Sequence, residues 1–416
     1  MALLIRNLSQ LATPLGDAAR RGRTMREILT VQSPVIVIEE ERFAFAGSEK
    51  EIPPDLRARI GEDFDAEGAT AIPGFVDSHT HLPFAGFRES EFNRRLQGET
   101  YEQIAASGGG IASTVHSTRA AGEEELATLV VERCRTMARH GTTTAEAKSG
   151  YGLDFGNEMK QLRAIGVASR TSQVRLVPTC LAAHDIPPEA KGSTEAREAY
   201  LREVVEVIQP AAAKQGLARF CDVFVERGVY TREEGERVLR AGIASGLLPR
   251  IHADELSDTG GATLAAEVGA FSADHLMHVS EEGIRALAAA KTIANLLPAT
   301  SLFLMSERLA PGRALIDAGA AVALSTDCNP GSSMTESMQI VIQLATLRMR
   351  MTVEESLTAA TLNGAASLDL AGECGTIEKG KRADLVLIAA PSYLHLVYHF
   401  GVNLVSAVWR DGTRMV

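Results

Sequence analysis

The alternation of short apolar segments with longer helical stretches constrains the fold of this chain more than any other feature of its sequence. Eight apolar segments in its middle part have the length of strands, and stretches rich in Ala, Glu and Arg, such as 123–140 and 196–209, lie between them. Repeated alternation implies parallel strands joined by crossover helices, and about 300 residues holding such units are typical of a (β/α)8 barrel. The expected strands cover 74–79, 142–148, 175–184, 220–226, 248–252, 270–275, 292–297 and 322–327.

The two ends of the chain have a different texture. Short β segments there are separated by Gly, Pro and charged residues, as in a small β module. The expected strands are Ala2–Ile5, Val35–Glu39, Phe43–Ala46 and Asp65–Ala71 at the start, and Ala383–Ile388 and Leu404–Trp409 at the end. We therefore divide the chain into an N-terminal part (1–71), a barrel (72–371) and a C-terminal part (372–416).

Composition narrows the class of protein. Hydrophobic residues make up 45% of the chain, which is enough for a large core and excludes a disordered protein. The net charge of −11 argues against a general nucleic-acid binder. No apolar run is long enough for a membrane span, the first residues lack a signal-peptide pattern, and the five cysteines form no CxxC pair. We expect a soluble, cytoplasmic protein with neither nucleic acid nor membrane as a partner.

Ionisable residues mark the carboxyl ends of the expected strands. Five of the ten histidines lie at such ends. Catalytic groups of (β/α)8 barrels come from this end of the strands. The residues concerned are His79, His81, His184, Glu226, His252, His275 and Asp327.

Four of these residues are candidate metal ligands. His79 and His81 are two positions apart in an extended segment, so their imidazoles face the same side. His252 and Asp327 each end an apolar strand, and a buried carboxylate needs a cation or strong donors nearby. Three imidazoles and one carboxylate suit Zn²⁺ or Fe²⁺, with an open position for water. An HxH pair alone is more often two polar residues at a strand end.

Two nucleotide-binding patterns are missing from the sequence. It has no GxxxxGK[ST] loop and no GxGxxG after a strand. The glycine cluster Ser107–Gly110 has no strand before it, so we interpret the segment 107–114 as a mobile loop over the active face.

Several motifs of the sequence resemble those of a known family. The chain is similar to the amidohydrolase superfamily in Pro73-Gly-Phe-Val-Asp-Ser-His-Thr-His81, in Thr361-Leu-Asn-Gly-Ala365 and in the tail segment 375–385. More specific marks point to the branch that opens a cyclic amide. These are Lys148-Ser-Gly-Tyr-Gly152, Ala183-His-Asp185, Ile251-His-Ala-Asp-Glu255, Ser272-Ala-Asp-His275 and Asp327-Cys-Asn-Pro-Gly331.

The resemblance implies a fold, a substrate and a site. The fold is a distorted (β/α)8 TIM barrel of the α/β class, with a small β-sandwich domain built from both chain termini, commonly in a homodimer. The substrate is an imidazolone with a propionate tail, and the reaction is hydrolysis of its cyclic amide C–N bond. One Zn²⁺, Fe²⁺ or Fe³⁺ ion is implied, held by His79, His81, His252 and Asp327. The implied substrate contacts are Arg88, Tyr151, His184, Glu255, Asn329, Gly331 and Ser332.

The resemblance also implies three catalytic residues. Asp327 can take a proton from water and pass it on, and His275 can polarise the carbonyl. Glu255 can hold a ring N–H and orient the water. Which of the three moves each proton stays open.

Several alternatives remain at this stage. Another amidohydrolase, such as a cyclic-imide hydrolase or an aminoazole deaminase, would share the metal ligands, and a non-catalytic metal-binding protein would bind the ion without turnover. Glu226 could bridge a second metal. An isolated loop arginine such as Arg88 is usually a solvated surface residue, and Asn329-Pro-Gly331 is a turn by its own chemistry.

Overall fold

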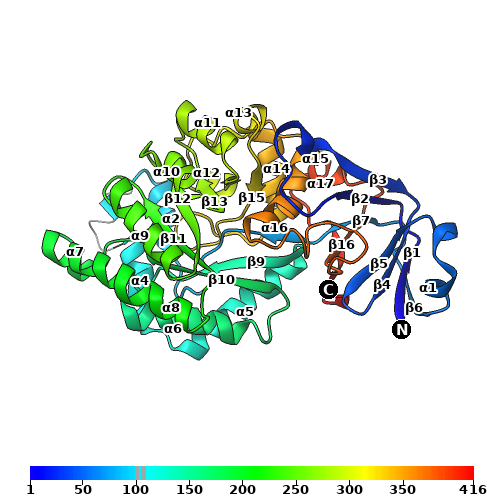
Figure 1. The fold of residues 1–416 in the computed structure, drawn as a ribbon, viewed down its shortest axis with the longest axis horizontal. Coiled ribbons are helices and arrows are strands. Elements are labelled where there is room, and N and C mark those ends of the chain that lie inside the picture. The colour runs from blue at the N-terminus through cyan, green and yellow to red at the C-terminus, as the bar shows by residue number, and fades with distance from the viewer. Residues whose placement is uncertain (100–102, 105–108) are drawn as a thin grey trace.

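A barrel and a smaller β-sandwich make up the described part of the chain. The structure is a computed structural model that describes residues 1–99, 103, 104 and 109–416. In Figure 1 the barrel takes up the left and centre, and strands from both termini form the right-hand part. The expected α/β fold with a (β/α)8 barrel is confirmed.

The barrel sheet contains, among the described residues, eight parallel strands in the order in which they follow one another in the chain. Each lies within or close to its expected segment, because short, mostly buried strand segments alternate with helical stretches in the sequence. They are β8 (Phe75–Asp77), β9 (Thr142–Lys148), β10 (Arg175–Ala183), β11 (Phe220–Val225), β12 (Leu248–Ala253), β13 (Ser272–His275), β14 (Ile293–Leu296) and β15 (Val322–Leu324).

The first and last strands of the barrel meet beyond their carboxyl ends. The amide of Asp327 donates to the carbonyl of His79, and the amide of His81 donates to the carbonyl of Cys328, each at 3.0 Å. These bonds close the barrel where the candidate ligands lie. Closure of the barrel between its first and last strands therefore places Asp327 beside His79 and His81.

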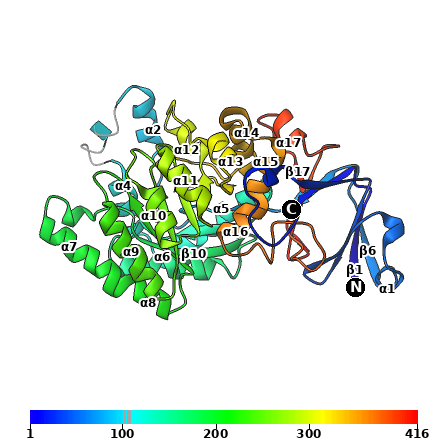
Figure 2. The same cartoon turned by 45° about the horizontal axis from the view of Figure 1, so that its top comes forward.

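Helices surround the barrel, and the turned view in Figure 2 shows α6, α8, α9 and α10 along its outside. Several begin at a side-chain cap: Thr231 and Glu234 form a capping box at α9, and Asp154 accepts the Asn157 amide at α6. The helices are α2 (Glu89–Leu96), α4 (Ile111–Ala120), α5 (Glu123–Arg139), α6 (Phe155–Ala168), α7 (Thr194–Glu203), α8 (Gln209–Lys214), α9 (Arg232–Ala244), α10 (Gly261–Val268), α11 (Glu281–Ala289), α12 (Pro298–Phe303), α13 (Gly312–Asp317), α14 (Met338–Met349), α15 (Val353–Thr358) and α16 (Gly364–Ser367), with α1 (Pro54–Arg57) and α17 (His395–Tyr398) in the terminal parts.

Two sheets from the chain ends form the sandwich. The sheet with order β5-β4-β1-β6 contains β1 (Ala2–Arg6), β4 (Val35–Glu39), β5 (Arg42–Gly47) and β6 (Ile60–Asp65). The sheet with order β18-β17-β16-β7-β2-β3 contains β2 (Gln10–Pro14), β3 (Ile28–Gln32), β7 (Thr70–Pro73), β16 (Leu385–Ile388), β17 (Val405–Arg410) and β18 (Thr413–Arg414). Because β16 pairs with β7, both chain ends share one sheet, which confirms the composite sandwich.

One expected terminal strand is wrong. Asp65–Ala71 is not a single strand, because β6 ends at Asp65 and β7 begins at Thr70 in the other sheet. The turn between them holds Glu67 and Gly68 at positive φ, of 51° and 82°, which an extended strand excludes. The strands β2 and β3 were not expected from the sequence, and the domain boundaries at 71/72 and 371/372 stay a prediction.

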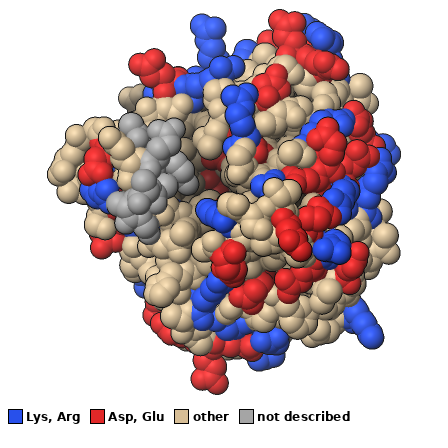
Figure 3. Space-filling view, turned by 90° about the vertical axis from the view of Figure 1, so that its left-hand side faces the viewer, with Lys and Arg blue, Asp and Glu red and all other residues tan. Residues whose placement is uncertain are grey.

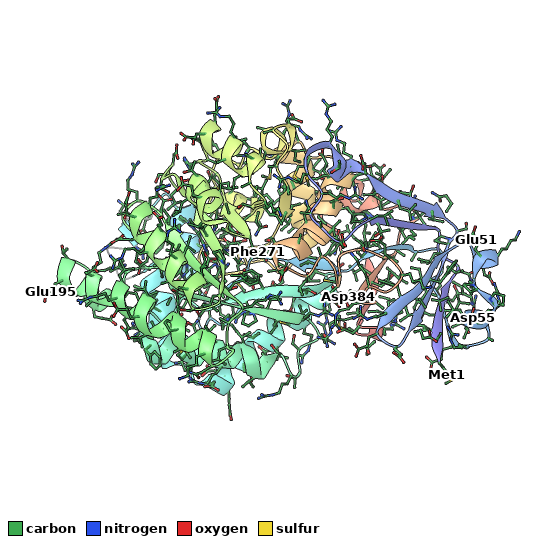
Figure 4. All side chains as sticks on the ribbon, in the orientation of Figure 1. Met1, Glu51, Asp55, Glu195, Phe271 and Asp384 are labelled. Atoms are coloured by element: carbon green, nitrogen blue, oxygen red, sulfur yellow. The ribbon has the colours of Figure 1, made fainter. Side chains whose placement is uncertain are left out.

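An ion-pair network joins the barrel to the sandwich. Arg175 of β10 lies 2.8 Å from Asp384 and 2.6 Å from Asp411. Figure 4 labels Asp384 at this junction, between the barrel and the terminal strands. No helix of the described residues is both long and apolar enough to cross a membrane.

Part of the expected loop 107–114 lies outside the described residues, namely Ser107 and Gly108. The expectation is wrong for residues 111–114, because they form the start of the helix α4. Within the described part, Gly110 adopts a φ of 80° directly before α4. A side chain would strain the backbone there.

Candidate active site

The four candidate metal ligands come together at the carboxyl end of the barrel. The Asp327 Oδ1 atom lies 3.5 Å from Nε2 of His79 and 3.4 Å from Nε2 of His81. The Nε2 atoms of His81 and His252 are 3.5 Å apart. All four side chains are buried. Residues from three strands thus aim one donor atom each at a common point.

The donor atoms fit a metal ion. Bonds of about 2.0–2.1 Å in a tetrahedral site place neighbouring ligand atoms about 3.4 Å apart, close to the observed spacings. His79 Nδ1 bonds Asp274 at 2.6 Å, while its buried Nε2 has no hydrogen-bond partner among the described residues. His252 Nδ1 bonds Asp222 at 3.0 Å. A carboxylate on Nδ1 leaves the Nε2 lone pair available for a ligand.

Burial sets the protonation of these groups. It lowers the pKa of His81 and His252 to about 4 and the pKa of His184 to about 3, so the rings are neutral. Burial raises the pKa of Asp327, but its contacts with His81 and His275 outweigh that effect and bring its pKa to about 2. Neutral imidazoles and an ionised carboxylate are the forms that bind metal.

Glu255 and His275 lie beside this cluster. The Oε2 atom of Glu255 is 3.6 Å from Nε2 of His275. Burial raises the pKa of Glu255 to about 7. A carboxyl group with that pKa can both accept and return a proton near neutral pH.

The backbone is strained at two of these residues. His275 and Asp327 have φ values of 76° and 58°, in the left-handed region that side chains disfavour. Each such residue costs about 1–3 kcal/mol, and the conformation persists because the surrounding structure holds it. His275 is the last residue of β13, Asp327 lies three residues after the end of β15, and both side chains turn toward the cluster.

A cavity of about 530 Å³ opens beside the cluster. Figure 3 views the end of the molecule away from the sandwich, and the surface there is hollowed near its centre, with charged groups at the rim. Every residue predicted to contact substrate lines the cavity, together with ligands and catalytic candidates. The lining includes His81, Arg88, Tyr151, His184, His252, Glu255, His275, Asp327, Asn329, Gly331 and Ser332.

Arg88 is not the solvated surface residue that an isolated loop arginine usually is. Its side chain is only 10% exposed and lies 2.9 Å from Glu91. A Cβ atom on Gly331 would lie 2.2 Å from Nη1 of Arg88. Gly331 therefore makes room for the guanidinium at the cavity wall.

Asn329 organises the turn before Gly331. Its Oδ1 accepts from the amides of Gly331 and Ser332, both at 2.8 Å, as a turn asparagine does. The Ser332 hydroxyl donates to Asp327 Oδ2 at 3.3 Å. The turn thus presents Ser332 to the candidate ligand.

The carboxylate of Glu226 is hydrogen-bonded to the loop that follows β12. It accepts the amides of Leu256 and Ser257 at 2.8 and 3.2 Å. The clusters of metal-capable side chains within the described ranges do not include it. These contacts favour one ion over a second one bridged by Glu226.

Sequence reasoning missed several residues of the site. Thr300 donates to Asp327 Oδ2 at 2.7 Å, and Arg95 lines the cavity and donates to the Gly331 carbonyl at 3.3 Å. Asp222 and Asp274, which hold His252 and His79, were also missed. For Asp222 the available signal was a carboxylate inside the otherwise apolar strand β11, and for Asp274 it was a carboxylate directly before His275 in β13.

Comparison with known proteins places the chain in a family. The amidohydrolase family model matches residues 70–415. The chain is 46% identical to the imidazolonepropionase of Porphyromonas gingivalis strain W83 over 415 residues, covering 99% of this chain and 97% of the relative. It belongs to the amidohydrolase family, among the imidazolonepropionases. The enzymes of that name from Geobacillus sp. WCH70 and Myxococcus xanthus are also 46% identical, covering 100% and 99% of this amidohydrolase and 98% and 96% of the relatives.

Solved structures share the fold. A zinc-bound adenosine deaminase from Xanthomonas campestris has a TM-score of 0.69 at 19% identity and covers 99% of this amidohydrolase and 92% of its own chain. A guanine deaminase from C. acetobutylicum has a TM-score of 0.69 at 15% identity, with 100% of both chains covered. At these identities the likeness concerns the fold alone.

Proposed function

We propose that this amidohydrolase hydrolyses the cyclic amide of 4-imidazolone-5-propanoate to N-formimidoyl-L-glutamate, a step of histidine degradation. The observation that carries the proposal is the cavity, which has the His and Asp cluster on one part of its wall and Arg88 on another. A small azole ring with a carboxylate tail fits this arrangement, because the cluster can act on the ring while Arg88 pairs with the carboxylate. The names of the relatives at 43–46% identity support the same substrate.

One divalent ion, zinc or iron, is the proposed cofactor. His79, His81, His252 and Asp327 would hold it, because their donor atoms converge and suit either metal. When bound, such an ion acidifies water and polarises the amide carbonyl.

Residues of the cavity wall are proposed to bind the substrate. The guanidinium of Arg88 is placed to pair with the propionate, a contact that can be bidentate. Tyr151 and His184 lie in edge-to-face ring contact, with centroids 5.2 Å apart, and offer aromatic surface to the azole. Asn329, Gly331 and Ser332 border the same cavity and supply polar groups from their turn.

Asp327, Glu255 and His275 are the proposed proton-moving and polarising groups. Asp327 is ionised and can accept a proton from the attacking water and deliver it to the leaving ring nitrogen. Glu255 can hold a ring N–H, and His275 can donate to the developing oxyanion. The pH–rate profiles of Asp327→Asn, Glu255→Gln and His275→Asn assign the protons, since the profile of the essential base loses its acidic limb.

Two further proposals follow from the resemblance to the family. The chain acts as a homodimer, and it works in the cytoplasm on a small-molecule substrate. Sedimentation of the purified protein measures the first, and a molar mass of one chain contradicts it. Fractionation of the source cells tests the second.

A direct turnover assay tests the proposed function. Freshly made 4-imidazolone-5-propanoate is given to the metal-loaded protein and the product is identified by NMR. Formation of N-formimidoyl-L-glutamate supports the proposal. No turnover of the imidazolone, with release of ammonia from an aminoazole, assigns the chain to deamination instead.

A further inference from the structure

Buried charges fill the barrel interior next to the His cluster. Glu146 and Lys148 of β9, Asp222 of β11, Arg250 of β12 and Asp274 of β13 are all 0% exposed. Branched apolar side chains usually fill this space in such barrels. Burying charge is costly, so five charged groups here call for an explanation.

These groups form one continuous chain between two of the candidate ligands. From the His252 end, Asp222 Oδ2 lies 2.6 Å from Lys148 Nζ, and Lys148 Nζ lies 2.8 Å from Glu146 Oε1. The same Glu146 oxygen is 3.2 Å from Arg250 Nε. Arg250 Nη2 lies 3.2 Å from Asp274 Oδ2, the oxygen that bonds His79.

The signs of the charges alternate along this chain. Each aspartate that holds an imidazole faces a cation, and Glu146 lies between the two cations. Burial alone would lower the pKa of Lys148, but Asp222 and Glu146 outweigh it and raise that pKa, so the group is an ammonium. Arg250 also donates to the carbonyls of Ser78 and Ser367 at 2.7 and 2.8 Å, which fixes its guanidinium.

The orientation of an imidazole depends on its partner at Nδ1. A carboxylate there fixes the tautomer and the direction of Nε2. The carboxylate is itself directed by the charged groups that bond it. The side chains of Glu146, Lys148 and Arg250 form no hydrogen bond or ion pair with the four candidate ligands within the described part of the chain. They bond instead to Asp222 and Asp274, which hold two of these ligands.

We propose that Glu146, Lys148 and Arg250 are positioning residues of the metal centre, which couple His79 and His252 into one unit through Asp274 and Asp222. The inference rests on the proposed function, since it takes these histidines as ligands. Loss of a middle member frees the aspartates to turn. Both imidazoles then lose their fixed direction, although no ligand has been changed.

Glu146→Gln tests the coupling, and Glu355→Gln is the matched control. Glu355 is also a buried carboxylate held by arginines, with Arg26 and Arg313 at 2.8 and 2.9 Å, and it lies in α15, outside the cavity lining. Metal affinity is measured by competition with a chelator, and the ligand field by the absorption of the Co²⁺-loaded protein. We expect Glu146→Gln to weaken binding by about 10-fold or more and to change the Co²⁺ spectrum. The control lowers the melting temperature and leaves both metal readouts unchanged.

The double variant Lys148→Met/Glu146→Gln keeps the net charge and guards against simple loss of folding. Trp409, the single tryptophan, lies in the sandwich and reports folding independently. We expect the double variant to bind metal weakly too, with a loss smaller than the product of the single losses, because both changes break one unit. Folded variants that bind Zn²⁺ and Co²⁺ as the wild type does overturn the coupling. A wild-type protein that binds neither ion overturns the proposed function itself.

Discussion

The interiors of the barrel and of the sandwich differ in polarity. The sandwich core consists of apolar side chains such as Ile36, Leu385 and Trp409, whose ring packs edge-on against Phe64 at 5.0 Å. The barrel interior holds a chain of buried charges below a ring of histidines. Apolar burial stabilises without needing precise partners, whereas buried charge is tolerated only where every group is held.

This difference predicts where substitutions act. A change in the sandwich core alters stability and spares the chemistry. A change at the carboxyl end of the barrel alters the chemistry with less effect on folding, because those groups contribute little apolar burial. The predictions below run from the largest expected effect to the smallest.

Asp327→Asn removes the charge at the cluster and keeps the size of the side chain. We expect kcat/KM for the imidazolone to fall by about 1000-fold or more, since a proton acceptor and an anionic ligand are both lost. Steady-state kinetics with metal analysis of the same sample measures it. A variant that keeps its wild-type rate contradicts the proposed role of Asp327.

Ile36→Ala probes the other interior. Ile36 is fully buried in the sandwich core, so truncation should lower the free energy of unfolding by about 2–5 kcal/mol. Urea unfolding followed by the fluorescence of Trp409 measures it. We expect kcat/KM at 25 °C to stay within about twofold of the wild type. A large loss of activity in the folded variant would erase the contrast between the two regions.

Arg88→Met tests recognition of the substrate tail. Loss of a charge-assisted contact should raise KM by about 10- to 100-fold and change kcat less. Arg94→Met is the control, because Arg94 pairs with Glu99 and does not line the cavity. An analogue in which an amide replaces the carboxylate should not distinguish Arg88→Met from the wild type. Unaltered kinetics of Arg88→Met would remove Arg88 from the binding site.

The pH dependence of the metal-free protein is the mildest test. His81 and His252 have a pKa of about 4 in the fold, against about 6.5 in an unfolded chain. Below pH 6.5 the unfolded chain takes up protons that the folded one refuses, so stability is full above that pH and falls as the pH drops toward 4. Thermal melts across this range measure it, and His81→Gln should flatten the curve. If the melting temperature of the metal-free protein does not change from pH 7 to pH 4, the lowered pKa values of His81 and His252 in the folded protein are contradicted.

Much of the barrel could be predicted from the sequence because short strand segments alternate with longer helical stretches along the chain. The expected segment 142–148 coincides with β9, and the histidines at the strand ends indicated the site. His79, His81, His252 and Asp327 converge in the structure, and their role as metal ligands stays a prediction.

The terminal part was harder to predict from sequence. The strand β3 is mostly exposed, and β2 contains Gln10 and Thr13, so neither shows an alternating or apolar pattern. The strand β2 is placed by parallel pairing with β7, about 60 positions later in the chain, and β3 is placed by pairing with β2, which local sequence does not encode. The series of buried charged side chains behind the histidines was also not predictable, because its contacts join residues of different strands.

The central claim is that the barrel end is a centre for one metal ion that drives hydrolysis of a cyclic amide. Titration of the metal-free protein with Zn²⁺ or Fe²⁺, with turnover of 4-imidazolone-5-propanoate read at each step, tests it most directly. The account predicts no turnover without metal and a linear rise that ends at one ion per chain. Full turnover in the metal-free protein, or a rise that ends only at two ions per chain, would contradict it.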